Sequence, residues 1–216
     1  MKYVLSKFSH ELSNPLTALN SSIQMIELQH PEVKDFKFWS NLNYNVEYMR
    51  RLLTDFSDLS KSETLNYSTF SLRTLLEQVS LSFAAIIADS KVEYTSKIAP
   101  SIHQITGDKT KLQEVFLNLL KNAFDAASPD KTIYLDASLQ GDSIVISIRD
   151  TGCGMTNEQL KTIFEPFVTY KKNGTGLGLP ICQKIITAHG GNISISSVVN
   201  EGTTVTITLP VSSLSL

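Results

Sequence analysis

The spacing of apolar residues divides this chain of 216 residues into two parts. Over roughly the first sixty residues they recur every three or four positions, which predicts two long amphipathic helices. Pro31 separates the two patterns, because proline ends or kinks a helix, and the second helix is expected from about Val33 to Lys61. After Phe70, helical patterns alternate with short runs in which every second residue is apolar, as in strands. The sequence therefore predicts a helical hairpin followed by an α/β domain.

A single hairpin of this kind leaves apolar surface uncovered, because two packed helices cannot bury both of their apolar stripes. Two copies are therefore expected to associate as a dimeric four-helix bundle. We expect a homodimer through residues 1–62, a polar linker over residues 63–69 and a second domain over residues 70–216. The stripes comprise Leu5, Phe8, Leu12, Leu16, Leu19, Ile23 and Ile26, and then Leu42, Val46, Met49, Leu52, Leu53, Phe56 and Leu59.

The second domain is expected to be an α/β sandwich, in which a mixed sheet of about five strands packs against three helices. Helices are predicted over residues 71–89 and 109–127 and after the glycines near residue 178. Strands are predicted over residues 91–98, 101–106, 132–139, 143–150, 192–198 and 203–209.

Composition excludes several classes of partner. The chain has 19 basic and 21 acidic residues, a net charge of −2, so it offers no basic surface for nucleic acid or an anionic membrane. The apolar runs are too short for a spanning helix or a signal peptide. Cys153 and Cys182 have neither C-x-x-C nor metal-site spacing, which indicates reduced thiols. We expect a cytoplasmic chain with no direct membrane insertion, alone or as the cytosolic end of something larger.

The first helix carries a histidine with polar neighbours. His10 lies about 160° from the centre of the apolar stripe and is expected to face solvent. Glu11 follows it directly, and Asn14 lies one turn later on the same side. A His-Glu-x-x-His zinc site would need a second histidine where Asn14 stands. An exposed imidazole beside a carboxylate suits a nucleophile better than a metal ligand, although His10 taken alone also fits an ordinary surface histidine.

Three features of the second part suit a nucleotide. Asn118 and Asn122 lie one turn apart, and an amide oxygen is a suitable Mg²⁺ ligand beside phosphates. Asp150 ends a predicted strand before two glycines, so a flat ring such as adenine could approach while the acid accepts from its amine. The glycine-rich segment 174–178 leads into a helix N-terminus, which suits phosphate.

Each feature has an ordinary alternative in isolation: solvated amides, a capped turn or a plain glycine-rich loop. The segment 174–178 has neither the ending of a P-loop nor the spacing of a dinucleotide-binding unit.

In this order, five motifs spread over nearly the whole chain resemble those of the sensor histidine kinases of two-component systems. SHELSNPL resembles the phospho-acceptor box, LQEVFLNLLKNAFDA the asparagine box, DTGCGM the first glycine box, FEPF the phenylalanine box and GTGLGL the second glycine box. Any one of them could occur by chance, whereas five in sequence are specific. The resemblance implies a dimerisation and histidine-phosphotransfer hairpin, followed by an ATP-binding domain of the GHKL type.

The resemblance also implies ATP and Mg²⁺ as cofactors. His10 would accept the γ-phosphoryl group of ATP, Glu11 would act as general base, and Asn14 would orient water that dephosphorylates a response regulator. Asn122 would bind Mg²⁺, and Asp150 would read adenine. Further residues of the implied ATP site are Asn118, Lys121, Gly152, Gly154, Lys171 in the short lid VTYKKN, Gly174, Thr175, Gly176, Leu177, Gly178 and Thr203.

The implied activity is that of a protein-histidine kinase, which passes its phosphoryl group to an aspartate of a response regulator receiver domain. The family normally carries a sensor upstream, and Met1 lies only nine residues before His10. We therefore expect an upstream sensor domain or a separate sensor protein. A protein-serine kinase on the same fold would not require the His10 hairpin. A non-catalytic ATP-binding scaffold would be expected to have lost His10, Asn122 or Asp150.

Overall fold

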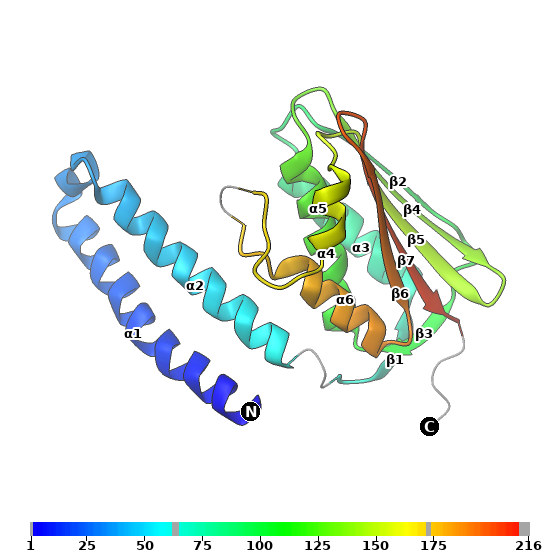
Figure 1. Ribbon diagram of the computed structural model, residues 1–216, viewed down its shortest axis with the longest axis horizontal. Coiled ribbons are helices and arrows are strands. Elements are labelled where there is room, and N and C mark those ends of the chain that lie inside the picture. Colours follow the sequence, from blue (N-terminus) through cyan, green and yellow to red (C-terminus); the bar gives the residue numbers. More distant parts are fainter. Residues whose placement is uncertain (1, 62–64, 172–173, 212–216) are drawn as a thin grey trace.

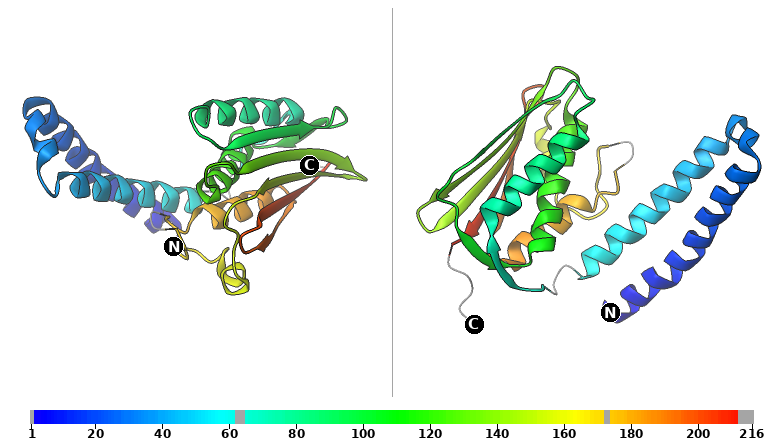
Figure 2. Two further views of the ribbon diagram at one scale, coloured as in Figure 1. Left: turned by 90° about the horizontal axis from the view of Figure 1, so that it is seen from above. Right: turned by 180° about the vertical axis from the view of Figure 1, so that it is seen from behind.

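The computed structural model describes residues 2–61, 65–171 and 174–211, with the side chains of residues 2–10 and 58–61 outside the description (Figure 1). A helical hairpin lies beside an α/β domain, and α2 lies between α1 and that domain in Figures 1 and 2. The two parts occur in the predicted order. No helix in the described part of the chain is long and apolar enough to cross a membrane.

The hairpin consists of α1 (Lys2–Gln29), a 3-10 helix η1 (Pro31–Asp35) and α2 (Trp39–Lys61). The predicted start of the second helix near Val33 was wrong. Pro31 instead begins the 3-10 turn, which ends at Phe36 in an extended conformation, so α2 starts only at Trp39. The Glu27 carboxylate on α1 accepts hydrogen bonds from Trp39 Nε1 and Asn43 Nδ2, both at 2.8 Å, and so ties the two helices together.

Part of the predicted apolar stripe is buried within the hairpin, and part is not. Ile23 and Val46 are buried, at 7% and 4% exposure, where α1 meets α2. Other members of the stripe are exposed, namely Leu12, Leu19, Ile26, Leu42 and Met49. This is the uncovered surface that the sequence predicts, and the homodimer stays a prediction.

The second domain contains a five-stranded sheet in the order β2-β4-β5-β7-β6. Only β2 and β4 are parallel, so the sheet is mixed as expected. Its strands are β2 (Glu93–Ile98), β4 (Thr132–Gln140), β5 (Ser143–Asp150), β6 (Asn192–Val198) and β7 (Gly202–Pro210). Its helices are α3 (Leu72–Ile86), α4 (Lys109–Ala126), α5 (Asn157–Thr162) and α6 (Gly178–Ala188).

Two short elements differ from the prediction. Residues 68–71 form the strand β1, which starts inside the predicted linker and pairs antiparallel with β3 (Gln104–Gly107) in a separate two-stranded sheet. A strand of four residues that forms only by pairing with a segment distant in sequence shows little alternation of apolar and polar residues from which it could be predicted. The fourth helix, α5, was also not predicted, because its six residues are too few for a helical period to show. A capping box between Thr156 and Gln159 stabilises its first turn.

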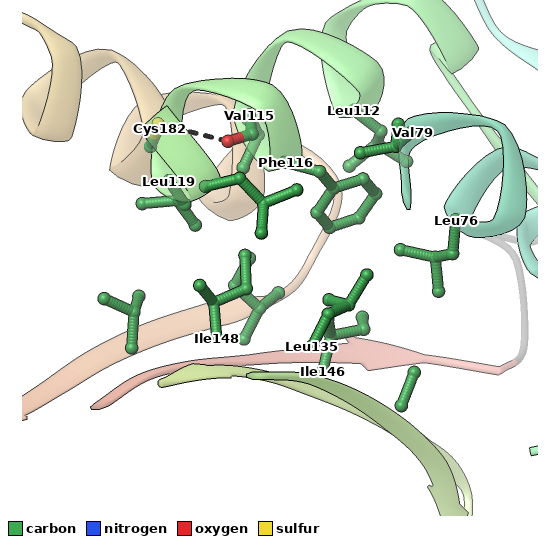
Figure 3. Close-up of a cluster of buried hydrophobic side chains, with 14 of the residues drawn as sticks. Leu76, Val79, Leu112, Val115, Phe116, Leu119, Leu135, Ile146, Ile148 and Cys182 are labelled. Atoms are coloured by element: carbon green, nitrogen blue, oxygen red, sulfur yellow. Dashed lines mark hydrogen bonds between the residues drawn. The ribbon is translucent and has the colours of Figure 1, made fainter. Parts of the chain in front are cut away.

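The core lies between one face of the large sheet and the helices α3, α4 and α6 (Figures 1 and 2). Alternate residues of β5 point toward the helices, which explains why Ile144, Ile146 and Ile148 are buried. Figure 3 shows Ile146 and Ile148 below Phe116 and Leu119 of α4. This packing fixes α4, so the opposite side of that helix is held in place relative to the ends of β5 and α6.

Candidate nucleotide site

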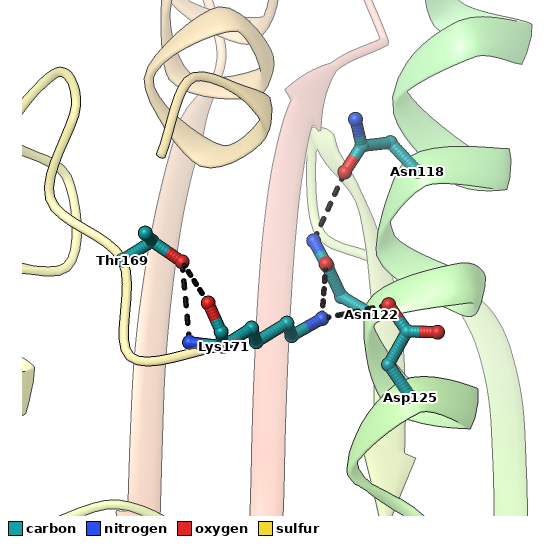
Figure 4. Close-up of polar contacts among 5 residues, drawn as sticks. All are labelled: Asn118, Asn122, Asp125, Thr169 and Lys171. Atoms are coloured by element: carbon teal, nitrogen blue, oxygen red, sulfur yellow. Dashed lines mark hydrogen bonds and ion pairs between the residues drawn. The ribbon is translucent and has the colours of Figure 1, made fainter. Parts of the chain in front are cut away.

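The helix α4 carries the predicted asparagine pair beside its buried face. Asp108 caps its N-terminus by accepting from the Lys111 N–H at 3.0 Å. Asn118 and Asn122 are half-buried, and Nδ2 of Asn122 donates to Oδ1 of Asn118 at 2.9 Å. Because this bond takes the amide nitrogen, the Asn122 oxygen faces away from Asn118 (Figure 4). Lys121 is exposed on the same helix.

Asp150 is a buried carboxylate at the end of β5, with 5% of its surface exposed. Its Oδ1 accepts from the backbone N–H groups of Gly152 at 2.8 Å and Thr203 at 3.3 Å. Within the described residues no protein donor reaches Oδ2, which leaves that oxygen for a ligand. Burial raises the pKa of Asp150, while the two N–H donors and the charge of Lys171 act in the opposite direction.

Gly152 allows the loop after β5 to approach α4 closely. A Cβ at this position would lie 2.4 Å from the Ala126 carbonyl oxygen and 2.8 Å from Asp150 Oδ1. Any side chain here would displace the loop or the carboxylate. The first glycine box is therefore seated directly against the C-terminal end of the asparagine helix.

The second glycine segment meets the same helix near its middle, at Asn118. A Cβ at Gly178, the first residue of α6, would lie 2.9 Å from the Asn118 amide. The preceding loop holds Gly174, Thr175, Gly176 and the buried Leu177. The Gly176 carbonyl accepts from the Phe167 N–H at 3.0 Å, which connects this loop to the FEPF segment.

The short lid reaches the asparagine pair through Lys171. Its ammonium donates to Asn122 Oδ1 at 2.8 Å and to Asp125 Oδ2 at 3.0 Å (Figure 4). The structure thus brings Asp150, Gly152, Asn118, Asn122, Lys171 and Gly178 together around α4.

Residues 107–213 match the family of histidine kinase-, DNA gyrase B- and HSP90-like ATPases. This domain belongs to that ATPase family. The whole chain is also related to sensor histidine kinases. Sporulation kinase C of Bacillus subtilis (strain 168) is 32% identical over 207 residues, which cover 95% of this chain and 48% of that protein. The signal transduction histidine-protein kinase AtoS of Escherichia coli (strain K12) is 31% identical over 209 residues, which cover 96% of this chain and 34% of AtoS.

Solved structures show the same fold over nearly the whole chain. Full-length ShkA in complex with AMPPNP has a TM-score of 0.82 and 22% identity, over 97% of this chain and 46% of that one. The histidine kinase ThkA, in complex with the response regulator protein TrrA, has a TM-score of 0.70 and 23% identity, over 97% and 61%. The chain spans about half the length, or less, of the two curated relatives named above.

In the ATPase domain, the Lys171 ammonium lies where the expected metal ion would bind. The Asn122 oxygen accepts a hydrogen bond from this ammonium, and the bond from the Asn122 amide nitrogen to Asn118 fixes the orientation of that oxygen. An oriented amide oxygen of this kind fits Mg²⁺, which takes few protein ligands and keeps water and phosphate oxygens around it. The residues present therefore fit the ion that the resemblance implies.

Sequence reasoning missed two contacts of the ATPase domain. The Thr175 hydroxyl donates to Asp55 Oδ2 on α2 at 2.6 Å, across 120 positions of sequence, so no local signal could have found it. Asp125 stands on the same helix as Asn118 and Asn122, but only the fold reveals its pairing with Lys171. Thr203, expected to support the aspartate, donates to Asp150 through its backbone N–H, while its hydroxyl pairs with Ser197 Oγ at 2.9 Å.

The hairpin residues of the predicted site lie on α1. Glu11 and Asn14 are both exposed. The backbone of His10 is helical, and its side chain lies outside the described residues. The roles expected for these three residues stay predictions.

Proposed function

We propose that this chain is the catalytic core of a sensor histidine kinase, which uses ATP to phosphorylate its own His10. The observation that carries the proposal is the gathering of Asp150, Asn122 and Lys171 around α4, within a domain of the ATPase family. His10 stands on the long helix of the same chain, in a segment that resembles the phospho-acceptor box. The division into a hairpin over residues 1–62, a linker over 63–69 and an ATP-binding domain over 70–216 is part of the proposal.

Each polar group has a task in holding the nucleotide. Asp150 Oδ2 accepts from the exocyclic amine of adenine, because Oδ1 is already engaged by the protein. Asn122 holds Mg²⁺, which offsets the charge of the phosphates when bound. The N–H groups of residues 174–178 lead into α6 and face the phosphates. Asn118, Lys121, Gly154, Lys171 and Thr203 complete the proposed site.

The proposed reaction moves the γ-phosphoryl group of ATP to His10. A ring nitrogen of the neutral imidazole forms a bond to phosphorus while the bond to the β–γ bridging oxygen breaks and ADP leaves. Glu11 takes the proton from the other ring nitrogen. The product is a phosphoramidate, which passes its phosphoryl group to an aspartate of a response regulator. Asn14 orients water for the later dephosphorylation of that regulator.

Two findings support the proposed partners. The exposed apolar residues of α1 and α2 support a homodimer through residues 1–62. ThkA has been solved with the response regulator protein TrrA, which supports a receiver domain as the second partner. An upstream sensor domain or sensor protein is proposed as the source of the signal.

Labelled ATP tests this proposal. Incubation with γ-labelled ATP and Mg²⁺ should give a protein-bound label that is lost in acid and retained in alkali, as expected for phosphohistidine. His10→Gln should abolish the label, because the nucleophile is gone, and leave AMPPNP affinity close to wild type, because the nucleotide site lies in the other domain. The measurements are label incorporation and equilibrium AMPPNP binding.

Other outcomes would assign the chain to a different class. An acid-stable label that survives His10→Gln would indicate a protein-serine kinase. AMPPNP binding without any label would indicate a non-catalytic ATP-binding scaffold. Label at the wild-type level in His10→Gln would remove the central claim.

A further inference from the structure

The Lys171 ammonium contacts Asn122, the proposed Mg²⁺ ligand. Lys171 extends from the lid so that its ammonium lies between Asn122 Oδ1, at 2.8 Å, and Asp125 Oδ2, at 3.0 Å (Figure 4). At the other end of the residue, the Lys171 N–H donates to Thr169 Oγ1 at 3.2 Å and its carbonyl accepts from the Gly174 N–H at 3.2 Å. The Lys171 side chain therefore anchors the described part of the lid to α4.

The ammonium and Mg²⁺ require the same atom. The Asn122 amide cannot turn its nitrogen toward the lysine without losing the bond to Asn118 Oδ1, so its oxygen is the group offered to any cation. A second cation at that oxygen would lie within a few ångströms of the ammonium, where like charges repel. Asp125 lies one turn further along α4 and offers the lysine a partner that does not depend on the nucleotide.

We propose that Lys171 and Asp125 form a resting latch, in which the ammonium occupies the Asn122 oxygen until the metal–nucleotide complex displaces it. This inference rests on the proposed function, since it concerns the same ATP site. Asp125 is then a positioning residue that acts through Lys171. Displacement frees the lid from α4 and makes the ammonium available to the phosphate oxygens. Binding of the metal–nucleotide complex and release of the lid from α4 are therefore coupled.

The structure distinguishes this role of Asp125 from direct metal binding. Asn122 is half-buried and oriented by Asn118, as a ligand needs to be, whereas the Asp125 side chain is 40% exposed and its described partner is Lys171. Removal of its charge should therefore weaken the resting state and leave the loaded state unchanged. A metal ligand would behave in the opposite way.

A double-mutant cycle tests the latch through equilibrium binding of Mg²⁺–AMPPNP to the whole chain. Asp125→Asn should tighten binding by about two- to fivefold, the size of one exposed ion pair. In the Lys171→Met background the same substitution should have no effect, because no ammonium remains to be held. Hydrogen exchange of residues 168–171 of the lid in nucleotide-free protein should rise in Asp125→Asn, because the anchor is weakened.

Glu114→Gln is the matched control. Glu114 is also an exposed acid on α4 and pairs with Lys111 at 2.7 Å, but it forms none of the site contacts. It should change neither AMPPNP affinity nor lid exchange. If Asp125→Asn weakened AMPPNP binding equally in the wild-type and Lys171→Met backgrounds, Asp125 would be a metal ligand and the latch would be refuted. An AMPPNP affinity that Asp125→Asn leaves unchanged in the wild-type background would also refute the latch. Failure of the wild-type chain to bind AMPPNP would instead refute the proposed function.

Discussion

At the scale of single residues, burial of Asp150 should favour ligand binding at the expense of stability. Burial raises its pKa, so its contribution to stability is present in acid and is lost as pH rises through the folded-state pKa. Asp150→Asn should therefore raise the melting temperature of nucleotide-free protein at pH 7, by about 2–4 °C for each kcal/mol gained in the free energy of unfolding. That gain should shrink in acid, where the wild-type carboxyl is protonated and therefore neutral like the amide.

The same substitution should weaken AMPPNP binding about tenfold or more, by the loss of one charge-assisted hydrogen bond. The Gly152 and Thr203 N–H groups would hold the amide oxygen, which leaves the new NH₂ group to face the adenine amine, donor against donor. Melting curves at two pH values and a binding titration measure both effects. Tighter binding together with lower stability would contradict the assignment of Asp150.

The residue types of the site could be predicted from sequence, but their partners could not. Asn122 and Asp150 stand in recognisable local patterns, because amide pairs on a helix and an acid before glycines have direct chemical uses. Lys171 meets Asn122 across 49 positions, and the backbone N–H of Thr203 reaches Asp150 across 53. Such contacts depend on how strands and helices pack, which local spacing does not contain.

At the scale of secondary structure, a buried histidine joins the ends of two helices. His189 follows α6, where its Nδ1 contacts the Ile185 carbonyl at 2.7 Å and its Nε2 accepts from the Asp108 N–H at the start of α4, at 2.9 Å. The imidazole is therefore neutral, with its proton on Nδ1. Burial lowers its pKa, although the Ile185 carbonyl and the Asp108 carboxylate oppose this.

A depressed histidine pKa gives stability that is present above pH 6.5, the ordinary value, and is lost as pH falls toward the folded-state pKa. Wild-type protein should therefore lose stability between pH 7.5 and pH 5.5. His189→Gln should cost about 1–3 kcal/mol at pH 7.5, because it leaves a buried partner unsatisfied, and should flatten this pH dependence. Urea unfolding at both pH values measures the two effects. Equal acid losses in variant and wild type would show that other groups carry the dependence.

Elements with a complete local pattern were predicted well. β5 and β6 have the predicted bounds, because alternate residues through most of each strand are isoleucines, at 144, 146 and 148 in β5 and at 193 and 195 in β6. β1 and the late start of α2 were missed, since the first depends on pairing with β3 and the second on the turn that begins at Pro31. Periodicity thus defines long elements and says little about short ones made by tertiary contacts.

At the scale of the whole molecule, the hairpin and the ATPase domain meet near the glycine-rich loop of residues 174–178. Phe56 of α2 packs against the core of the domain, and the neighbouring Asp55 accepts from the Thr175 hydroxyl at 2.6 Å. The order of the two parts was predicted, whereas this contact was not, because it joins surfaces that carry no sequence signature. It places a carboxylate beside the loop that the proposed function assigns to phosphates.

Asp55 should therefore both hold the two parts together and disfavour the triphosphate. Asp55→Asn keeps an oxygen for Thr175 and removes the charge, so it should tighten AMPPNP binding severalfold without separating the parts. Asp55→Ala also removes the hydrogen bond, worth about 1–3 kcal/mol, and should accelerate proteolytic cleavage within residues 62–69. Thr54→Ala is the matched control, because the neighbouring Thr54 is exposed and its hydroxyl donates to the Arg50 carbonyl within α2. Cleavage of Asp55→Ala at the rate of Thr54→Ala would mean that Phe56 and its neighbours hold the domains together without help from Asp55.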